Sequence, residues 1–230
     1  MRRALAIFDV DGTLVPPPGA EVRFARFLRA RGQLTPTRVA AYALRIPLRL
    51  LVDGVLAFKR NKAYLNGMGG RALEELADAF VDGQGPEFWN ADVLARLEMH
   101  RAQGDRVLLL TGTPDVVARA MAHRLAVAWE ASVLDRRDGR VTARAPRQHP
   151  HGRSKLAIAR RVASAWGCPL EEAWAYGDAW ADRHLLSSVG HPVAVHPGPR
   201  LLRLARQRGW EVIGPDRRRP AGGIRTSADS

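Results

Sequence analysis

Apolar and polar positions follow two different patterns along the chain. From residue 105 onward, short apolar runs alternate with segments whose apolar residues recur at the helical period. These segments predict helices ending near residue 125 and covering 154–166 and 200–208. The apolar runs predict strands at 107–110, 173–176, 193–195 and 211–213. Such an alternation predicts a parallel sheet with helices on its faces.

The chain before residue 105 has one apolar run, at 4–10, which predicts a further strand. After this run the apolar residues recur near the helical period, and Thr35 is placed to cap a helix. The helical periods are found at 22–28, 73–80 and 93–97. In the later part of the chain, Asp138-Gly139 predicts the turn of a short hairpin around Val133 and Val141.

The expected fold class is therefore α/β, with a Rossmann-like three-layer core, a parallel sheet and an inserted all-helical lobe. Residues 1–15 and 105–213 are expected to form the core, and residues 16–104 the helical lobe. Residues 214–230 lack apolar periodicity, so they are predicted to be a disordered tail.

Composition agrees with a soluble globular protein. Of the 230 residues, 46% are hydrophobic and 26% are charged. A single cysteine excludes a disulfide scaffold and indicates a reducing, cytoplasmic compartment. A secretory signal is not expected, because Asp9 and Asp11 interrupt the apolar run near the N-terminus.

The longest apolar stretch, at 39–58, is not expected to cross a membrane. It contains Arg45, Arg49 and Asp53, and each charge would cost about 2.5–3.5 kcal/mol at the centre of a spanning helix. One or two soluble helices are expected there, with a helix on the membrane surface as the alternative.

The chain is strongly basic, with 36 Lys and Arg against 23 Asp and Glu and a net charge of +13. The excess is spread along the sequence, and a positive surface suits an anionic substrate. No zinc finger, basic zipper or aromatic stacking motif specifies a nucleic-acid partner.

Three predicted strands end in polar loops that contain glycine. These loops are Asp9-Val10-Asp11-Gly12-Thr13, Thr111-Gly112-Thr113 and Gly177-Asp178. Ligands of open α/β sheets bind beyond the carboxyl ends of the strands, so the three loops are expected to converge on one site.

Asp9 and Asp11 are two residues apart at a strand end, so their side chains start on the same face. One carboxylate can attack phosphorus and form an acyl phosphate, and the other can exchange protons with the leaving group and with water. Two carboxylates and a phosphate repel one another, so a bridging cation is expected, and Mg²⁺ fits. Asp178 and Asp182 can supply further oxygen ligands, and Gly12 allows a tight turn beside the anion.

The second loop and a lysine can hold the phosphate. Thr111 offers its hydroxyl, and Gly112 and Thr113 offer backbone amides at the start of a helix. Lys155, at the start of another helix, can balance the charge of the transition state.

These motifs, in this order, resemble those of the haloacid dehalogenase (HAD) superfamily. The string Asp9-Val10-Asp11-Gly12-Thr13-Leu14 is similar to its first motif, and Leu110-Thr111-Gly112-Thr113-Pro114 to its second. Lys155 and Tyr176-Gly177-Asp178-x-x-x-Asp182 are similar to the third and fourth. The helical lobe resembles the C1 cap of subfamily IB, which contains phosphoserine phosphatases.

The resemblance implies that Asp9 is the nucleophile and Asp11 the general acid and base. It implies that the Asp9 carboxylate, the Asp11 backbone carbonyl and Asp178 bind Mg²⁺. Asp182 would orient a metal-bound water or Lys155. The phosphoryl group would be bound by Gly12, Thr111, Gly112 and Lys155.

The chain departs from the phosphoserine phosphatases just after the first motif. Those enzymes usually have a glutamate there that binds the amino group, whereas this chain has Pro16-Pro17-Pro18, and Glu21 comes later. In the lobe, Lys59, Arg60 and Lys62 form a basic cluster near Tyr64. This cluster is interpreted as either a solvated helix face or a grip on a second anionic group.

His149 and His151 precede Lys155 and are interpreted as loop residues rather than as a metal pair. The function expected is that of a Mg²⁺-dependent phosphomonoesterase acting on a small phosphorylated metabolite through an aspartyl-phosphate. The alternatives are a phosphotransferase with the same intermediate and a basic protein acting on nucleic acid or on a lipid phosphate. The oligomeric state is not predicted.

Overall fold

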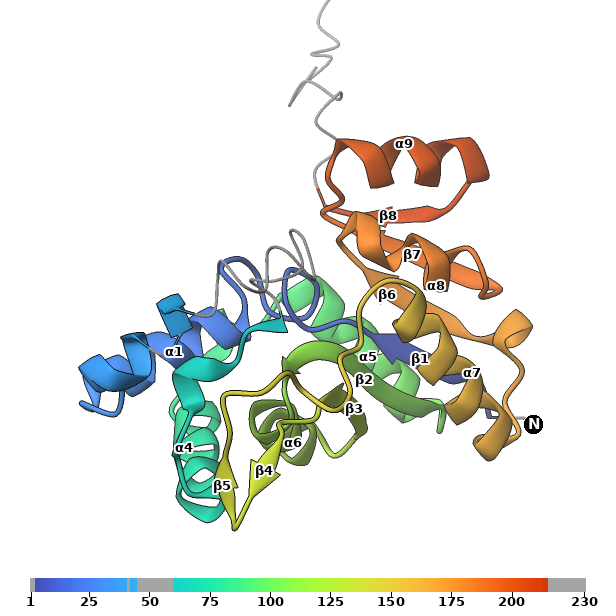
Figure 1. Cartoon of the computed structure of the whole chain (residues 1–230). Coiled ribbons are helices and arrows are strands. Elements are labelled where there is room, and N and C mark those ends of the chain that lie inside the picture. The colour runs from blue at the N-terminus through green and yellow to red at the C-terminus, as the bar shows by residue number, and fades with distance from the viewer. Residues whose placement is uncertain (1–2, 41, 45–59, 215–230) are drawn as a thin grey trace, which may run out of the picture.

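A six-stranded parallel sheet forms the centre of the computed structural model, which describes residues 3–40, 42–44 and 60–214 (Figure 1). Its strand order is β3-β2-β1-β6-β7-β8. The strands are β1 (Leu5–Phe8), β2 (Arg106–Pro114), β3 (Ala128–Ser132), β6 (Trp174–Gly177), β7 (His191–Val195) and β8 (Glu211–Ile213). Phe8 of β1 pairs with Leu109 on one side and Tyr176 on the other, so β1 is central.

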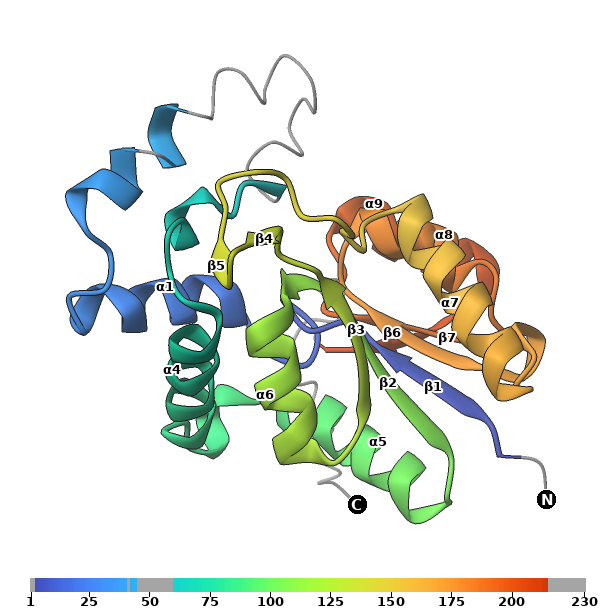
Figure 2. The same cartoon turned by 60° about the horizontal axis from the view of Figure 1, so that its bottom comes forward.

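Helices cover both faces of the sheet, as Figure 2 shows. The helices on one face are α5 (Ala91–Ala102) and α6 (Asp115–Leu125). Those on the other face are α7 (Arg153–Trp166), α8 (Arg183–Leu186) and α9 (Pro199–Arg208). Ala6 and Phe8 of β1 belong to one buried cluster, whereas Leu5 and Ile7 belong to the other. Alternate side chains thus fill two apolar layers, and the predicted α/β fold with a parallel sheet is confirmed.

The described residues between β1 and α5 are helical or irregular and lie beside α6 (Figure 1). They contain α1 (Ala20–Ala30), η1 (Ala63–Leu65), α4 (Gly70–Asp82) and η2 (Pro86–Phe88). The ring centroid of Phe80 lies 5.3 Å from that of Phe24 and 5.7 Å from that of Phe88, which joins α1, α4 and η2. Arg119 of α6 donates to both carboxylate oxygens of Asp78 on α4 at 2.7 Å.

Helix α5 packs on the sheet rather than on the other inserted helices. His100 Nε2 lies 2.9 Å from the Tyr176 hydroxyl, and His100 Nδ1 lies 2.8 Å from Asp105 Oδ2. Asp105 in turn accepts a hydrogen bond from the backbone of Ala4. We therefore propose that the inserted lobe ends before α5 rather than at residue 104.

Local sequence signals account for some of the element boundaries. Thr35 Oγ1 accepts a hydrogen bond from the Arg38 amide, as expected of a helix cap. A hairpin forms with the predicted turn at Asp138 and Gly139, and its strands are β4 (Arg136–Arg137) and β5 (Arg140–Val141). The first strand was expected around Val133, which instead pairs with Gln148. Both turn residues have positive φ, 50° and 72°, which suits this tight turn.

Strand β3 was not predicted. Its sequence, Ala-Trp-Glu-Ala-Ser, lacks an apolar run because the strand lies at the sheet edge, where Trp129 is 37% exposed. Most of the apolar stretch 39–58, and the tail beyond Gly214, lie outside the described residues. In the part of the chain that is described, no helix is long and apolar enough to cross a membrane.

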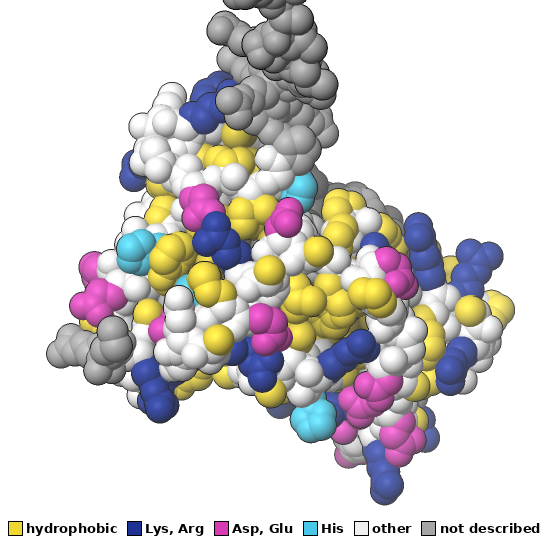
Figure 3. All heavy atoms as spheres, turned by 180° about the vertical axis from the view of Figure 1, so that it is seen from behind, with side chains coloured by type: hydrophobic (Ala, Val, Ile, Leu, Met, Phe, Trp, Pro, Cys, Tyr) yellow, Lys and Arg dark blue, Asp and Glu magenta, His cyan; other side chains and the backbone are white. Residues whose placement is uncertain are grey.

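Basic side chains are distributed over the surface. Figure 3 shows the face turned away in Figure 1, where the Lys and Arg side chains of the described residues alternate with acidic and apolar ones. This distribution agrees with the spread of positive charge along the sequence.

Candidate active site

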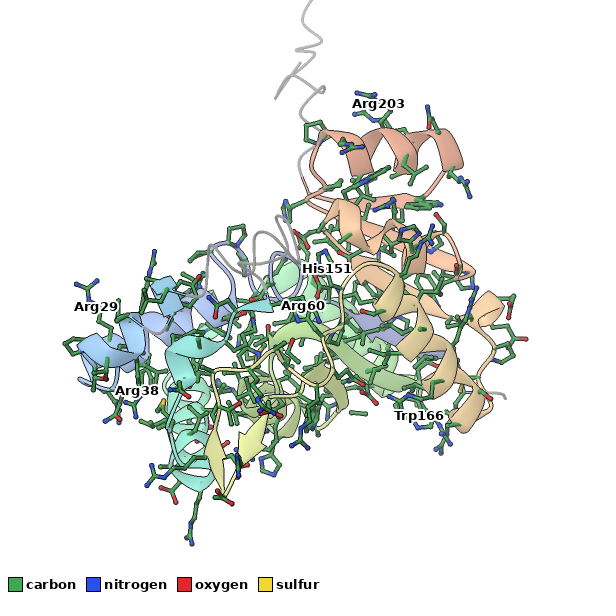
Figure 4. All side chains as sticks on the ribbon, viewed as in Figure 1. Arg29, Arg38, Arg60, His151, Trp166 and Arg203 are labelled. Atoms are coloured by element: carbon green, nitrogen blue, oxygen red, sulfur yellow. The ribbon has the colours of Figure 1, made fainter. Side chains whose placement is uncertain are left out.

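The ends of β1, β2 and β6 meet at a cavity of about 620 Å³. Asp9 and Asp11 follow β1, Thr111 and Gly112 lie near the end of β2, and Asp178 follows β6; all five line the cavity. Figure 4 labels His151, a residue of the cavity wall, near the centre of the molecule, between the helical lobe and α7. The convergence of the three loops, predicted from their places after adjacent strands, is therefore present in the structure.

The loop after β1 folds back tightly because its backbone bonds to itself. The Gly12 amide donates to the Val15 carbonyl, and the Val15 amide donates to the Val10 carbonyl, both at 2.8 Å. Gly12 has a φ of +90°, and a Cβ atom there would lie 2.2 Å from Asp178 Oδ2. The loops after β1 and β6 can approach this closely because position 12 carries no side chain.

The Asp11 carboxylate is clamped between the start of α1 and the end of β2. Its Oδ1 accepts hydrogen bonds from the Ala20 amide at 2.5 Å and the Glu21 amide at 3.3 Å. Its Oδ2 accepts one from the Thr113 hydroxyl at 2.6 Å. A carboxylate at a helix N-terminus is stabilised by the unpaired amides and the helix dipole. Both oxygens of Asp11 are thereby fixed in orientation.

Lys155 bridges two carboxylates at the first turn of α7. Its Nζ lies 2.7 Å from Asp9 Oδ1 and 2.7 Å from Asp182 Oδ1, and the lysine is only 5% exposed. Burial alone lowers the pKa of Lys155, but the negative charges of Asp182 and Asp9 outweigh it and raise the pKa above its usual value. Lys155 is therefore a fixed positive charge beside Asp9.

Asp182 holds this lysine and also the loop after β6. Its Oδ1 accepts the Lys155 hydrogen bond, and its Oδ2 accepts one from the Ala179 amide at 3.1 Å. Both of its oxygens are thus engaged by the protein. This arrangement favours an orienting role for Asp182 over direct metal ligation.

Carboxylate oxygens of Asp9, Asp178 and Asp182 lie within 4.8 Å of one another. Burial raises the pKa of Asp9 well above its usual range, and although Lys155 lowers it, Asp182 and Asp178 raise it further. Burial, then Asp182, raises the pKa of Asp178 to about 6. Crowded, buried carboxylates with shifted pKa values are typical of a functional site. Because both oxygens of Asp182 are already bonded, Asp9 and Asp178 are the carboxylates of this group that are left to bind a small divalent cation, and oxygen donors fit Mg²⁺.

A chain of hydroxyls connects the second loop to Asp11. Thr111 Oγ1 donates to Thr113 Oγ1 at 2.9 Å and accepts from the Thr113 amide at 3.1 Å. Both threonines are fully buried. The side chain of Thr113 thus contacts Asp11 directly, whereas the sequence indicated only a backbone donor at this position.

Two histidines interpreted as loop residues also line the cavity. His149 and His151 both precede α7, and His149 Nδ1 lies 2.5 Å from Ser132 Oγ. Ser132 Oγ donates to the Gly112 carbonyl at 2.7 Å, so β3 supports the second loop. The one sequence signal that could have placed His149 and His151 at the cavity is their position just before Lys155.

The two described members of the basic cluster in the lobe, Arg60 and Lys62, do not line the cavity. Lys59, the third member, lies outside the described residues. Lys62 is 2% exposed and donates to Glu21 Oε2 at 2.5 Å, so the solvated-face interpretation is wrong for this lysine. Glu21 and Tyr64, by contrast, line the cavity.

Comparison with known proteins assigns the family. The model of the haloacid dehalogenase-like hydrolases matches residues 6–187, which include the three converging loops. The chain belongs to this family. The family predicted from the motifs is thereby confirmed.

The relatives of this hydrolase include phosphatases. Phosphoserine phosphatase SerB1 of Mycobacterium tuberculosis is 34% identical over 217 residues, which cover 91% of this chain and 70% of that protein. A protein of unknown function from Bordetella pertussis Tohama I has a TM-score of 0.76 at 25% identity, covering 93% of this chain and 99% of that chain. A substrate-bound phosphoserine phosphatase shares the fold, with a TM-score of 0.62 at 17% identity and 93% coverage of both chains. The prediction of an enzyme of the phosphatase class is confirmed.

Proposed function

We propose that this hydrolase removes the phosphoryl group from a small organic phosphate, with Asp9 as the nucleophile. The buried Asp9 carboxylate beside Lys155 and Asp178 is the observation that supports this proposal most strongly. The 34% identity to a protein named phosphoserine phosphatase supports a small phosphorylated substrate. The cytoplasmic location expected from the single cysteine stays a prediction.

Asp9 and Asp11 divide the chemistry between them. An oxygen of Asp9 attacks phosphorus, the ester P–O bond breaks, and protonated Asp11 gives its proton to the departing alkoxide. Asp11 then takes a proton from water, whose oxygen attacks the phosphorus of the aspartyl-phosphate. Inorganic phosphate leaves, and Asp9 is regenerated. The clamp of Ala20, Glu21 and Thr113 holds the Asp11 carboxylate in one orientation for both proton transfers.

Lys155, Thr111 and Gly112 would bind the phosphoryl oxygens, since all three line the cavity next to Asp9. The fixed charge of Lys155 would stabilise the negative charge that develops in the transition state. Asp9, Asp178 and the Asp11 carbonyl would hold Mg²⁺, which supplies charge neutralisation between the carboxylate and the phosphoryl group. Asp182 keeps Lys155 in place.

The test is phosphate release from a panel of phosphorylated metabolites, with Mg²⁺ and with EDTA. Asp9→Asn keeps the shape of the side chain but removes its charge, and should lower kcat by at least about 10³-fold. Asp138→Asn, at the exposed hairpin turn, is the matched control and should retain wild-type turnover.

Wild-type turnover in folded Asp9→Asn, or full activity in EDTA, would reject this mechanism. Added alcohols separate hydrolysis from phosphoryl transfer, because transfer yields a new phosphate ester instead of inorganic phosphate.

A further inference from the structure

The cavity wall away from Asp9 is built mainly from apolar side chains. It is formed by α1, the loop before it and the segment that follows it. Its apolar members include Pro17, Pro18, Val22, Ala25, Leu34 and Val39. The part of the substrate beyond the phosphate would therefore meet carbon atoms over most of its surface.

Glu21, an acidic residue of this wall, is already paired within the protein. Its Oε2 accepts from Lys62 Nζ at 2.5 Å, and its Oε1 accepts from the Tyr64 hydroxyl at 3.2 Å. Lys62 is 2% exposed and Glu21 is 23% exposed, so the lysine of this ion pair is shielded from water while the carboxylate faces the cavity. A substrate ammonium group would find the charge of Glu21 neutralised by a lysine 41 positions further along the chain.

Asn61, another polar residue of the wall, is also satisfied by the protein. Its Nδ2 donates to the Tyr42 carbonyl at 3.0 Å, and its Oδ1 accepts from the Ala63 amide at 3.1 Å. The carboxylate and the amide of this wall are thus bonded internally. A substrate ammonium buried against this wall would have to share Glu21 with Lys62, so the cost of removing it from water would be compensated less well than by an unshared carboxylate.

Apolar surface continues from the cavity to the outside. Val22 is 43% exposed and Val39 is 51% exposed, and both line the cavity. Few large hydrophobic residues of the described chain are this exposed, and Val22 and Val39 are two of them. An apolar chain longer than the cavity could extend along this rim.

We propose that the substrate is the phosphate monoester of an apolar alcohol, with an alkyl or similar hydrocarbon body and no ammonium group. This inference rests on the proposed function and specifies its substrate class. It places the phosphate at Asp9 and Lys155 and the hydrocarbon against Val22, Leu34 and Val39.

The first experiment measures kcat/KM for n-alkyl phosphates from ethyl to octyl, each below its micellar concentration. Burial of one methylene is worth about 0.8 kcal/mol, so kcat/KM should rise roughly two- to fourfold for each methylene that enters the wall. A matched pair, phosphoserine and O-phospho-3-hydroxypropionate, differs only in the ammonium group. Wild type should hydrolyse phosphoserine no better than its deaminated analogue.

Two variants test the residues named. Val22→Asn should lower the ratio of octyl to ethyl phosphate turnover by about tenfold, since it places an amide on the apolar wall. Trp129→Gln, on the exposed edge strand outside the cavity, should keep the wild-type ratio. Lys62→Met removes the charged partner of Glu21 and leaves it only the Tyr64 hydroxyl, so it should raise the ratio of phosphoserine to deaminated-analogue turnover by about tenfold.

The outcomes separate the two proposals. Turnover that is independent of alkyl length, or a tenfold preference of wild type for phosphoserine over its analogue, would overturn this inference and leave the proposed function standing. Absence of turnover with every phosphomonoester, in folded protein, would overturn the proposed function and this inference together. If Lys62→Met does not fold, the alkyl series and the matched pair, both measured on wild type, still test the proposed substrate class.

Discussion

Gly12 lies where the loop after β1 meets the loop after β6. Its φ of +90° belongs to the region that favours glycine, and a Cβ atom would lie 2.2 Å from Asp178 Oδ2. The distance between Asp9 and Asp178, and hence the proposed metal site, depends on this one residue.

Gly12→Ala is expected to displace Asp178. The affinity for Mg²⁺ should fall at least about tenfold, and kcat about 100-fold, because ligand and nucleophile lose their mutual geometry. Titration calorimetry with Mg²⁺ and phosphate-release assays would measure the two effects.

The matched control is Gly139→Ala. Gly139 also has a positive φ, +72°, but a Cβ atom there would meet nothing within 4 Å. The Gly139→Ala variant should therefore carry the same kind of backbone strain as Gly12→Ala but keep the wild-type affinity for Mg²⁺. Equal Mg²⁺ affinity in the two variants would contradict the role given to Gly12.

At the scale of elements, the end of β2 and the start of α1 together orient Asp11. The helix contributes two amides, and the strand contributes the Thr113 hydroxyl at 2.6 Å. Because α1 also lines the cavity, the element that anchors the proposed acid and base also shapes the substrate wall.

Thr113→Val removes the hydroxyl while keeping the shape of the side chain. The loss of a hydrogen bond to a carboxylate should lower kcat roughly ten- to 100-fold, since such bonds are worth about 1.5–3 kcal/mol. Thr142→Val is the control, because Thr142 also donates to a carboxylate, that of Asp135, but beside the hairpin. An unchanged kcat in Thr113→Val would contradict the role of Thr113 in orienting Asp11.

At the scale of the whole molecule, one apolar cluster spans the inserted lobe and the core. It includes Phe24 and Phe80 of the lobe together with Phe8 and Leu109 of the sheet. We therefore expect the lobe and the core to unfold together, in a single transition.

Phe80→Ala should lower the free energy of unfolding by about 3–5 kcal/mol, because Phe80 is 2% exposed. Urea unfolding followed by tryptophan fluorescence and by residual activity would measure this change, and the two curves should coincide. Phe27→Ala, at a partly buried position of the same cluster, should cost less. Activity lost well before the fluorescence change would show that the lobe unfolds independently.

The sequence predicts the strands of the site well because each is an apolar run followed directly by Asp, Thr or Gly. Strand β3 was missed since Glu130 interrupts its apolar character at the sheet edge. The ion pair of Glu21 with Lys62 could not be predicted, because helical periodicity does not determine which distant charges meet. For the same reason the sequence did not show that Thr113 contacts Asp11, 102 positions away.

The measurement that tests the account most directly is the trapping of the proposed aspartyl-phosphate. Wild-type protein and Asp9→Asn would each be mixed with Mg²⁺ and an alkyl phosphate that the wild-type enzyme hydrolyses. The reaction would then be quenched and treated with borohydride, which reduces an acyl phosphate to the corresponding alcohol. Peptide mass spectrometry is expected to find the reduced side chain at position 9 in wild type, and no reduced residue in Asp9→Asn. Reduction at another carboxylate, or phosphate release by Asp9→Asn at the wild-type rate, would contradict the assignment of Asp9 as the nucleophile.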